Sequence, residues 1–452
     1  MKRWRFIAVI MAALLLGLVS LAEARLVAYY RLDFRECVKL ALLQNQEIKA
    51  AGHDIDTVLA KKIEATKRYI PVVKYQYRTG PVPRDLDNPI QSFFVKRDIS
   101  VLSAVKIEAA APLYTFGRLG LAKELADLGV NLKTLQKKQK ENEIALNIYK
   151  LYNGILLARE LKSLIHEGLD AIDKKIHELE LEETTDQLQI LKMKVILYEA
   201  ERKLQEAEIK ELIALATLKV LTGLEDDVDF DIKSKSLGQE LFSYDNFTDV
   251  LERAKGYRPE YQLLAKGIQA QGKKVALEKR EYFPNIGVGT FGEMGVTPGI
   301  IGDEDDNTFV NPFNYKRAGV GVEMSGTLDV RKTKARVSEA RAEYMKLLAQ
   351  KQIAGRGLEL DLKKSFLELK QHQFLLSRAE KDKRAARQIV FLTKSNLDVG
   401  LGEKKDYLDA LQTYLLFQGR AYEAIFNYNS AVATLKVKMG LLYPEQKSGI
   451  TY

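Results

Sequence analysis

The sequence predicts a mainly α-helical protein in which long coiled-coil hairpins are combined with four β-strands, in an arrangement that occurs twice. All ten prolines lie within 71–112, within 259–312 or at Pro444, so two long stretches lack this helix breaker. Apolar residues in the second stretch recur at spacings of three and four, as in a coiled coil. Similar segments recur at a shift of about 213 positions, which indicates an internal duplication.

The N-terminal segment, residues 1–24, has the pattern of a secretory signal peptide. Basic residues precede an apolar run over 6–21, and Ala22 and Ala24 are the small residues of a cleavage site. An uncleaved membrane anchor is the alternative, but the run is short for a membrane span. We expect the mature chain to begin at Arg25. No later run approaches about eighteen consecutive apolar residues, so no transmembrane helix is expected in it.

The remainder divides into two predicted repeats, residues 25–240 and 241–452. The shift sets 69–71 opposite 282–284, and the string at 216–220 recurs unchanged at 433–437, four positions further displaced. Each repeat is expected to contain a helix of about 38 residues, a strand pair, a long helix of about 70, and a return helix of about 38. Glycine then ends each return helix, at the positions Gly223 and Gly440.

Two long helical hairpins are expected, at 113–222 and at 327–440. The second turns at Gly400, Leu401 and Gly402, and its outgoing arm would be about 100 Å long at the rise of an α-helix. Its returning arm should pack along another helix, because it carries the coiled-coil pattern noted above: Leu408, Leu411, Leu415, Tyr422, Ile425 and Val432.

The strand pairs are expected within 72–109 and within 286–325. In the first, Val73, Tyr75 and Tyr77 alternate with polar residues, so one face is apolar. The second alternates similarly, although glycine weakens its pattern. Between the strands run polar, turn-rich loops, with aromatic residues near the strand ends that resemble an interfacial girdle: Phe93, Phe94, Phe309, Phe313 and Tyr315.

These strand pairs permit two interpretations. They could be ordinary hairpins that cap a helical rod in water. Alternatively they enter a membrane, but four strands cannot close a barrel, since the smallest have about eight, and an open sheet edge cannot face lipid. A membrane barrel would therefore need strands from several chains.

Several short motifs together resemble the TolC family of outer-membrane efflux channels, over essentially the whole mature chain. The segments at 396–402, 406–410 and 428–429 match the family around the second hairpin. The segment at 112–118 matches its strand-to-helix motif, with the characteristic residues Pro112, Gly117 and Arg118. The first hairpin tip departs from the pattern, because Glu182-Glu183-Thr184-Thr185 replaces the glycine-containing turn. Adaptor contact at this tip is left open.

The resemblance implies a homotrimer in the outer membrane, with four strands per chain in one shared twelve-stranded β-barrel and the helices continuing as a tunnel through the periplasm. It implies a passive channel of a tripartite efflux or type I secretion system, with a periplasmic adaptor, an inner-membrane transporter and outer-membrane lipid as partners. Asp406 and Asp409 match the positions of the family's acidic pore constriction. Solvated helix residues are the alternative for both. Many relatives carry a lipidated N-terminal cysteine, which this chain lacks, so the barrel alone would anchor it.

Other chemistry has little support, and we expect no enzyme activity, cofactor or metal. Basic and acidic residues are interspersed despite the net charge of +9, which argues against nucleic acid. The glycine-rich segment 287–292 lacks a following helix for a dinucleotide phosphate, and the acidic loop 303–307 has no complete calcium-binding pattern. Cys37 is the only cysteine, and the four histidines show no metal-ligand spacing: His53, His166, His177 and His372.

A soluble periplasmic coiled-coil scaffold or adaptor is the alternative function. Within the channel class, the pore motifs do not distinguish the exported substrate, which could be a drug, a metal or a protein.

Overall fold

The structure is a computed structural model, and it describes residues 29–181, 187–225, 227–244, 246–300, 311–326 and 329–441. The predicted signal peptide at 1–24, the first hairpin tip at 182–185 and the acidic loop at 303–307 lie outside these residues. The described residues fall into two compact units. One unit takes its residues from the ranges Met1–Ala50, Lys138–Arg258 and Leu358–Tyr452; the other comprises Ala51–Lys137 and Pro259–Gly357.

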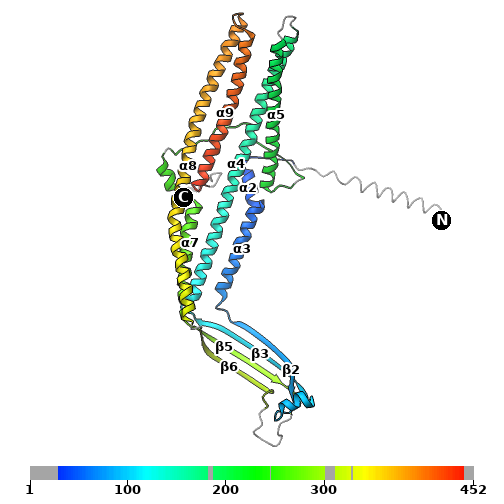
Figure 1. The fold of residues 1–452 in the computed structure, drawn as a ribbon, viewed down its shortest axis with the longest axis vertical. Coiled ribbons are helices and arrows are strands. Elements are labelled where there is room, and N and C mark those ends of the chain that lie inside the picture. Colours follow the sequence, from blue (N-terminus) through cyan, green and yellow to red (C-terminus); the bar gives the residue numbers. More distant parts are fainter. Residues whose placement is uncertain are drawn as a thin grey trace, which may run out of the picture. The chain divides into compact units, whose positions relative to one another are not determined.

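The two halves of the sequence contain helices and strands in the same order (Figure 1). The first half has α2 (Phe34–Gln44), α3 (Gln46–Lys67), β2 (Val72–Pro83), β3 (Ile99–Tyr114), α4 (Arg118–Leu181) and α5 (Gln187–Thr222). The second has α6 (Phe247–Tyr257), α7 (Pro259–Lys279), β5 (Asn285–Val296), β6 (Tyr315–Ser325), α8 (Val330–Asp398) and α9 (Lys404–Lys438). Short helical turns, η1 (Gln91–Lys96) and η2 (Arg280–Tyr282), precede β3 and β5.

The short helix predicted in each half is two helices. Asn45 interrupts the first, because its extended backbone ends α2 while its side chain accepts hydrogen bonds from the amides of Glu47 and Ile48 and so caps α3. At the equivalent place in the second half, Pro259 begins α7 and holds Arg258 extended. The two breaks therefore have different local causes.

Gly223 and Gly440 end the return helices in the same way. Each has a positive φ and closes a pair of backbone hydrogen bonds to the last helical turn, the arrangement known as a Schellman motif. Each also lies against a helix break. A Cβ on Gly440 would be 2.3 Å from the carbonyl carbon of Tyr257, and one on Gly223 would be 2.8 Å from the Cβ of Gln44. Both sites therefore need glycine for its conformation and for its size.

The first unit has buried apolar residues on all of its long helices, including Leu362 on α8 and Leu435 on α9. One hydrophobic cluster in this unit is formed mainly by α2, α4 and α5. Its buried residues lie between Leu32 and Leu237 in the sequence, and the partly buried Ile425 and Phe426 of α9 pack against it. Cys37 belongs to it, and burial raises the pKa of its thiol to about 12. This cysteine is a packing residue rather than a reactive thiol.

A two-stranded sheet, separate from the four-stranded sheet described below, joins the start of the described chain to the connection between the halves. Here β1 (Tyr29–Leu32) pairs in parallel with β4 (Asp229–Ile232). The connection then follows the helices: the amide of Leu237 donates to Glu160, and Asn429 accepts from the amide of Glu240. No such sheet was predicted from the sequence.

Charged side chains also connect helices within this unit. Arg159 and Lys162 on α4 bind Glu211 on α5, with nitrogen–oxygen distances of 2.7 and 3.0 Å. Arg258 and Lys438 bind Asp361 at 3.0 and 2.6 Å. Burial alone would raise the pKa of the Asp361 carboxyl, but hydrogen bonds from the two cations hold it below its ordinary value.

The second unit contains a four-stranded antiparallel sheet with the strand order β2-β3-β5-β6 (Figure 1). The alternation in the sequence predicted strands at 72–78, 99–109, 286–291 and 318–325, and all four strands of the structure are longer. The segment 287–292, which matched a dinucleotide pattern, is the middle of β5. This segment is part of a strand that pairs with β6, and a strand offers no helix N-terminus to hold a phosphate.

Candidate functional site

The four-stranded sheet has one apolar face. Residues directly opposite in an antiparallel register share a face, so Tyr75 on β2, Ile107 on β3 and Ala318 on β6 project from the same side. Large apolar side chains cover this side and are exposed to solvent in the single chain. They are Val73, Tyr75 and Tyr77 on β2, Val101, Val105 and Ile107 on β3, Met294 and Val296 on β5, and Val320, Val322 and Met324 on β6.

The opposite, polar face carries charged side chains that pair with one another. Arg78 on β2 lies 3.1 Å from Glu293 on β5, and the hydroxyl of Tyr315 on β6 donates to the same carboxylate at 2.9 Å. Lys106 pairs with Glu108 along β3. The sheet thus has the alternation of a membrane β-strand, with apolar residues on one side and polar residues on the other.

Glycines are concentrated on the polar face of β5 and β6. They leave room for two rings: a Cβ on Gly319 would be 2.8 Å from the ring of Phe291, and one on Gly295 would be 2.7 Å from that of Tyr315. Removing side chains from one face also allows a sheet to curve toward that face. The glycines that weakened the strand prediction are therefore the residues that make the polar face suitable as the concave side.

Both edges of this sheet lack a strand partner among the residues that the structure describes, because β2 and β6 are its outermost strands. Each edge presents a row of backbone N–H and C=O groups over about ten residues, which makes it a template for pairing with another strand. A strand of about 9–11 residues is long enough to cross a membrane at a tilt.

The predicted strand-to-helix motif forms a tight turn. Pro112 lies within β3, where the register with β5 shifts, because proline cannot donate to the ladder. Phe116 and Gly117 both have positive φ, and α4 begins at Arg118. Arg118 then binds Glu281 at 2.7 Å and the side-chain oxygen of Asn285 at 3.3 Å. The motif thereby connects the start of α4 to the start of β5.

The predicted tip turn at Gly400, Leu401 and Gly402 is also in the described structure. Gly400 has a φ of +75°, and the amides of Leu401 and Gly402 donate to the carbonyl of Asn396. Val399 and Leu401 are 69% and 84% exposed. A turn that is fixed by its backbone hydrogen bonds thus presents apolar side chains to solvent, which is typical of an interaction surface.

Asp406 and Asp409 lie in the first turns of α9, and both are exposed. Their spacing of three places them on neighbouring positions of the helix surface. Asp406 is in the first turn, where a negative charge also stabilises a helix N-terminus. A constriction would be formed by several chains, so the single chain does not test that role.

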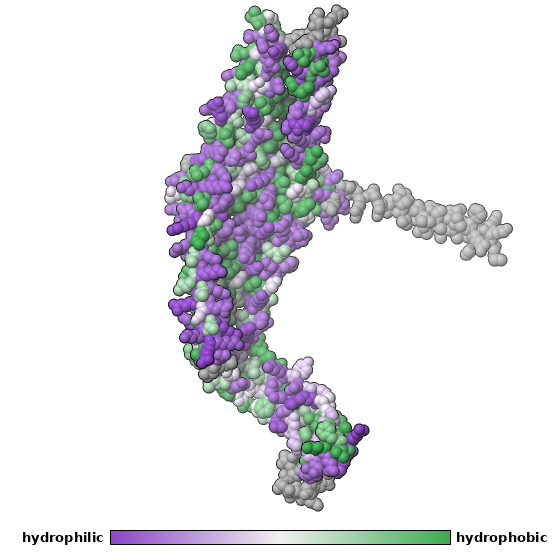
Figure 2. Space-filling view, viewed as in Figure 1, coloured by the Kyte–Doolittle hydropathy of each residue, from purple (hydrophilic) through white to green (hydrophobic). Residues whose placement is uncertain are grey.

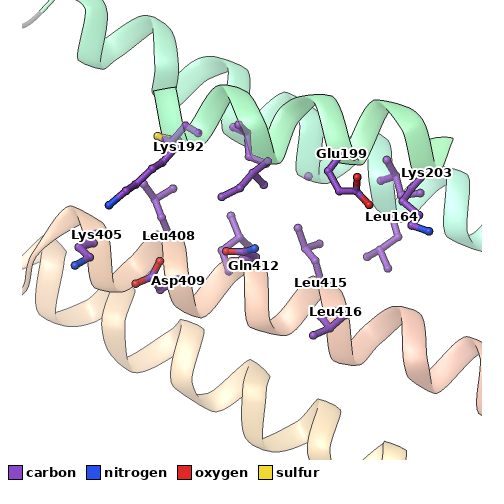
Figure 3. A pocket seen from close by; sticks show the side chains of 17 residues that line it. Leu164, Lys192, Glu199, Lys203, Lys405, Leu408, Asp409, Gln412, Leu415 and Leu416 are labelled. Carbon is purple, nitrogen blue, oxygen red and sulfur yellow. The ribbon is translucent and has the colours of Figure 1, made fainter. Parts of the chain in front are cut away.

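An apolar groove of about 570 Å³ lies between α9 and the hairpin of α4 and α5, all within the first unit (Figure 3). Leu164, Leu408 and Leu415 line it, and a Cβ on Gly168 would be 2.9 Å from Leu415. Charged residues from α5 and α9 surround it: Lys192, Glu199, Lys203, Lys405 and Asp409. The leucine periodicity of α9 predicted packing along another helix, but it carried no signal for a groove.

Two helices carry exposed apolar stripes at coiled-coil spacing. On α5 one exposed apolar group contains Leu191, Val195 and Tyr198, and a second contains Ile209 and Leu212; Arg202 and Gln205 occupy the positions between them. On α8 every seventh residue from Ile353 to Phe374 is a large apolar residue that is more than half exposed: Ile353, Leu360, Leu367 and Phe374. Stripes with this period pack against other helices.

Within the described ranges, no helix combines the length and the apolar character needed to cross a membrane. Over the same residues, no group of three or more His, Cys, Asp or Glu side chains is arranged to hold a metal ion.

No protein-family model and no curated protein matches the sequence. Solved structures do match the fold. The open state of the Neisseria gonorrhoeae MtrE outer membrane channel has a TM-score of 0.73 at 15% identity, over 90% of this chain and 88% of that one. The Campylobacter jejuni CmeC outer membrane channel has a TM-score of 0.71 at 14% identity, over 90% and 85%.

The outer membrane protein VceC of Vibrio cholerae has a TM-score of 0.70 at 13% identity, over 90% of this chain and 96% of that one. These similarities extend over nearly the full length of each chain. The expected combination of long helical hairpins and a four-stranded sheet is therefore confirmed, and the chain has the fold of these outer-membrane channels.

Proposed function

We propose that this protein is the outer-membrane channel of a tripartite export system. Three copies would each give four strands to one twelve-stranded barrel, and the helical hairpins would extend into the periplasm. The channel would be passive, with an inner-membrane transporter and a periplasmic adaptor supplying energy and substrate. The exported substrate, whether a drug, a metal or a protein, is left open.

The four-stranded sheet is the observation that carries this proposal. Its apolar face is unsuited to water, its polar face is unsuited to lipid, and its two edges expose unpaired backbone groups. Pairing β6 of one chain with β2 of the next in a closed ring would place the apolar face in lipid and the polar face in the lumen, and it would pair the backbone groups of both edges. A water-exposed hairpin pair would gain nothing from eleven large apolar side chains on one face.

The helices support the same assembly. The exposed apolar stripes on α5 and α8 would be buried if helices of neighbouring chains packed side by side in a ring. At the end of the second hairpin, the turn at Gly400–Gly402 would present the side chains of Val399 and Leu401 for contact with the adaptor. Because 182–185 lies outside the described residues, the proposal assigns no contact to the first tip.

Localisation and oligomeric state test this function directly. Cell fractionation should place the protein in the outer membrane, and light scattering in detergent should give a trimer. The competing function, a soluble periplasmic scaffold or adaptor, predicts protein that is released without detergent. Finding soluble protein, or a monomer in detergent, would refute the shared barrel.

Asp406 and Asp409 are proposed to form an acidic constriction around the trimer axis. Replacing both with Ala should raise the conductance of the closed channel and reduce cation selectivity, because the ring of carboxylates would be removed. Block by divalent cations should weaken about tenfold or more, since clustered charges in a narrow lumen concentrate counter-ions. Single-channel recordings in planar bilayers would measure all three effects.

The matched control is Asp170→Ala with Asp173→Ala, an exposed pair of carboxylates on α4 with the same spacing of three. This control should leave conductance and selectivity unchanged. If the two double variants behave alike, Asp406 and Asp409 are solvated helix residues and not a constriction.

A further inference from the structure

The loop between β2 and β3 presents a compact apolar surface to solvent. Ile90, Phe94 and Val95 are 74%, 75% and 72% exposed, although they sit in or beside the helical turn η1. Phe93 and Phe94 lie with their ring centroids 5.0 Å apart. Figure 2 shows hydrophobic residues gathered beside hydrophilic ones at this end of the sheet. Side chains of this size are costly to leave in water.

The backbone of this loop is held in place by its own hydrogen bonds. Ser92 is fully buried; its hydroxyl donates to the carbonyl of Asp98 at 2.7 Å and accepts from the amide of Asp85. Arg84 binds Asp98 at 3.4 Å. The apolar side chains are therefore exposed by a defined structure and not by an unfolded segment.

Two cations flank the apolar surface. Lys96 and Arg97 are both exposed, and no hydrogen bond or ion pair engages either side chain among the residues that the structure describes. The nearest carboxylate in the sequence, Asp98, is already bound by Arg84. Arg97 has a φ of +53°, a conformation that is uncommon for a residue other than glycine. A strained backbone thus holds two available positive charges beside the apolar group.

This surface continues the apolar face of the sheet. Ile99 and Val101 are 47% and 53% exposed, lie on the same side of β3 as Ile107, and follow directly after Arg97. An apolar band that ends in aromatic and basic side chains matches a bilayer from its hydrocarbon core to its headgroups.

We infer that residues 90–97 bind lipid at the membrane surface, with Ile90, Phe94 and Val95 among the acyl chains and Lys96 and Arg97 on the phosphate groups of anionic lipids. The inference rests on the proposed function, which places the apolar face in a membrane. A lipid surface fits better than a second copy of the chain, because the loop continues the lipid-facing side of the sheet rather than one of its edges.

A tryptophan probe can test this contact, because the only tryptophan of the sequence is in the predicted signal peptide. The mature F94W protein, without residues 1–24, would be reconstituted into vesicles that contain a zwitterionic and an anionic phospholipid at equal mole fraction, only one of which is brominated. Quenching of the indole should be at least about fivefold stronger with the anionic brominated lipid, since even one basic residue near an anionic surface favours it by about that factor.

The quenching preference should disappear in F94W with K96Q and R97Q. It should persist in F94W with K381Q and R387Q, which removes two exposed cations from α8. Circular dichroism and trimer formation would first show that each variant is folded. Equal quenching by both lipids overturns the phosphate contact, and no quenching by either overturns the lipid contact. An indole that is shielded in lipid-free trimers indicates a second copy instead. Protein that fails to enter vesicles refutes the proposed function itself.

Discussion

Gly440→Ala should lower the free energy of unfolding by about 3 kcal/mol or more, through strain of a left-handed residue and overlap with a neighbouring backbone. Gly440 has a φ of +79°, and a Cβ there would be 2.3 Å from the Tyr257 carbonyl carbon and 2.5 Å from the Arg258 nitrogen. Neither is the end of a flexible side chain, so the α6–α7 junction would have to move. Denaturant unfolding of the purified protein in detergent would measure the loss.

Gly400→Ala is the matched control for this effect. Gly400, on the tip turn, has nearly the same φ, +75°, but a Cβ added there would meet no neighbouring atom within 4 Å. It should lose only the conformational part, about 1 kcal/mol. Equal losses in the two variants would mean that the contact between Gly440 and the helix junction contributes nothing to stability.

Tyr75→Arg should strongly reduce assembly in the membrane. Tyr75 is 86% exposed on the apolar face of β2, and an arginine on the lipid side of a membrane strand costs about 2–4 kcal/mol near the midplane. Three chains would each carry the cost, so the trimer would lose up to about 6–12 kcal/mol. The amount of heat-resistant trimer in isolated outer membranes would report the effect.

Gln76→Arg, one position further along the strand, is the control. Gln76 is on the polar face, in the same row as Lys106 and Glu293, and the new cation would remain in water. Its trimer yield should stay close to that of the unaltered protein. If both arginines are tolerated equally, the apolar face does not contact lipid.

Much of the fold could be predicted because its determinants are local in the sequence. Proline placement excluded helix from the strand regions, and glycine marked the helix ends at Gly223 and Gly440. Alternation on β2 indicated a two-faced sheet. The strands proved longer, because at their ends the pairing with a neighbour, and not the alternation, determines where a strand stops.

Features that depend on distant partners could not be predicted in this way. The parallel pair of β1 and β4 joins segments about 200 residues apart, and four-residue strands carry too little pattern to be recognised. The shift of about 213 positions sets Asn45 opposite Arg258, yet only the structure reveals that Asn45 separates two helices by capping the second. The groove beside α9 likewise arises from three helices together.

The candidate site was predictable only in part for a similar reason. The tip turn and the strand-to-helix motif are contiguous in the sequence, and their positive-φ residues were indicated by glycine at 117 and 400. The residues at 90–97 carried only a weak aromatic signal. Their exposure follows from the buried Ser92 and its hydrogen bonds, which a sequence pattern does not reveal. The constriction at Asp406 and Asp409 stays a prediction.

The pairing of β1 with β4 bears on the order in which the chain acquires its structure. In a secreted chain the N-terminus crosses the inner membrane first, and domains generally fold as they become available. Because the buried residues of the cluster around α2, α4 and α5 lie between Leu32 and Leu237, that cluster can form once the chain has emerged as far as Leu237, before α6 to α9 follow. The first half would then be a template on which the second hairpin docks through Ile425 and Phe426. The two halves of the duplicated sequence would thus differ in folding order: the first would fold early, and the second would dock on it.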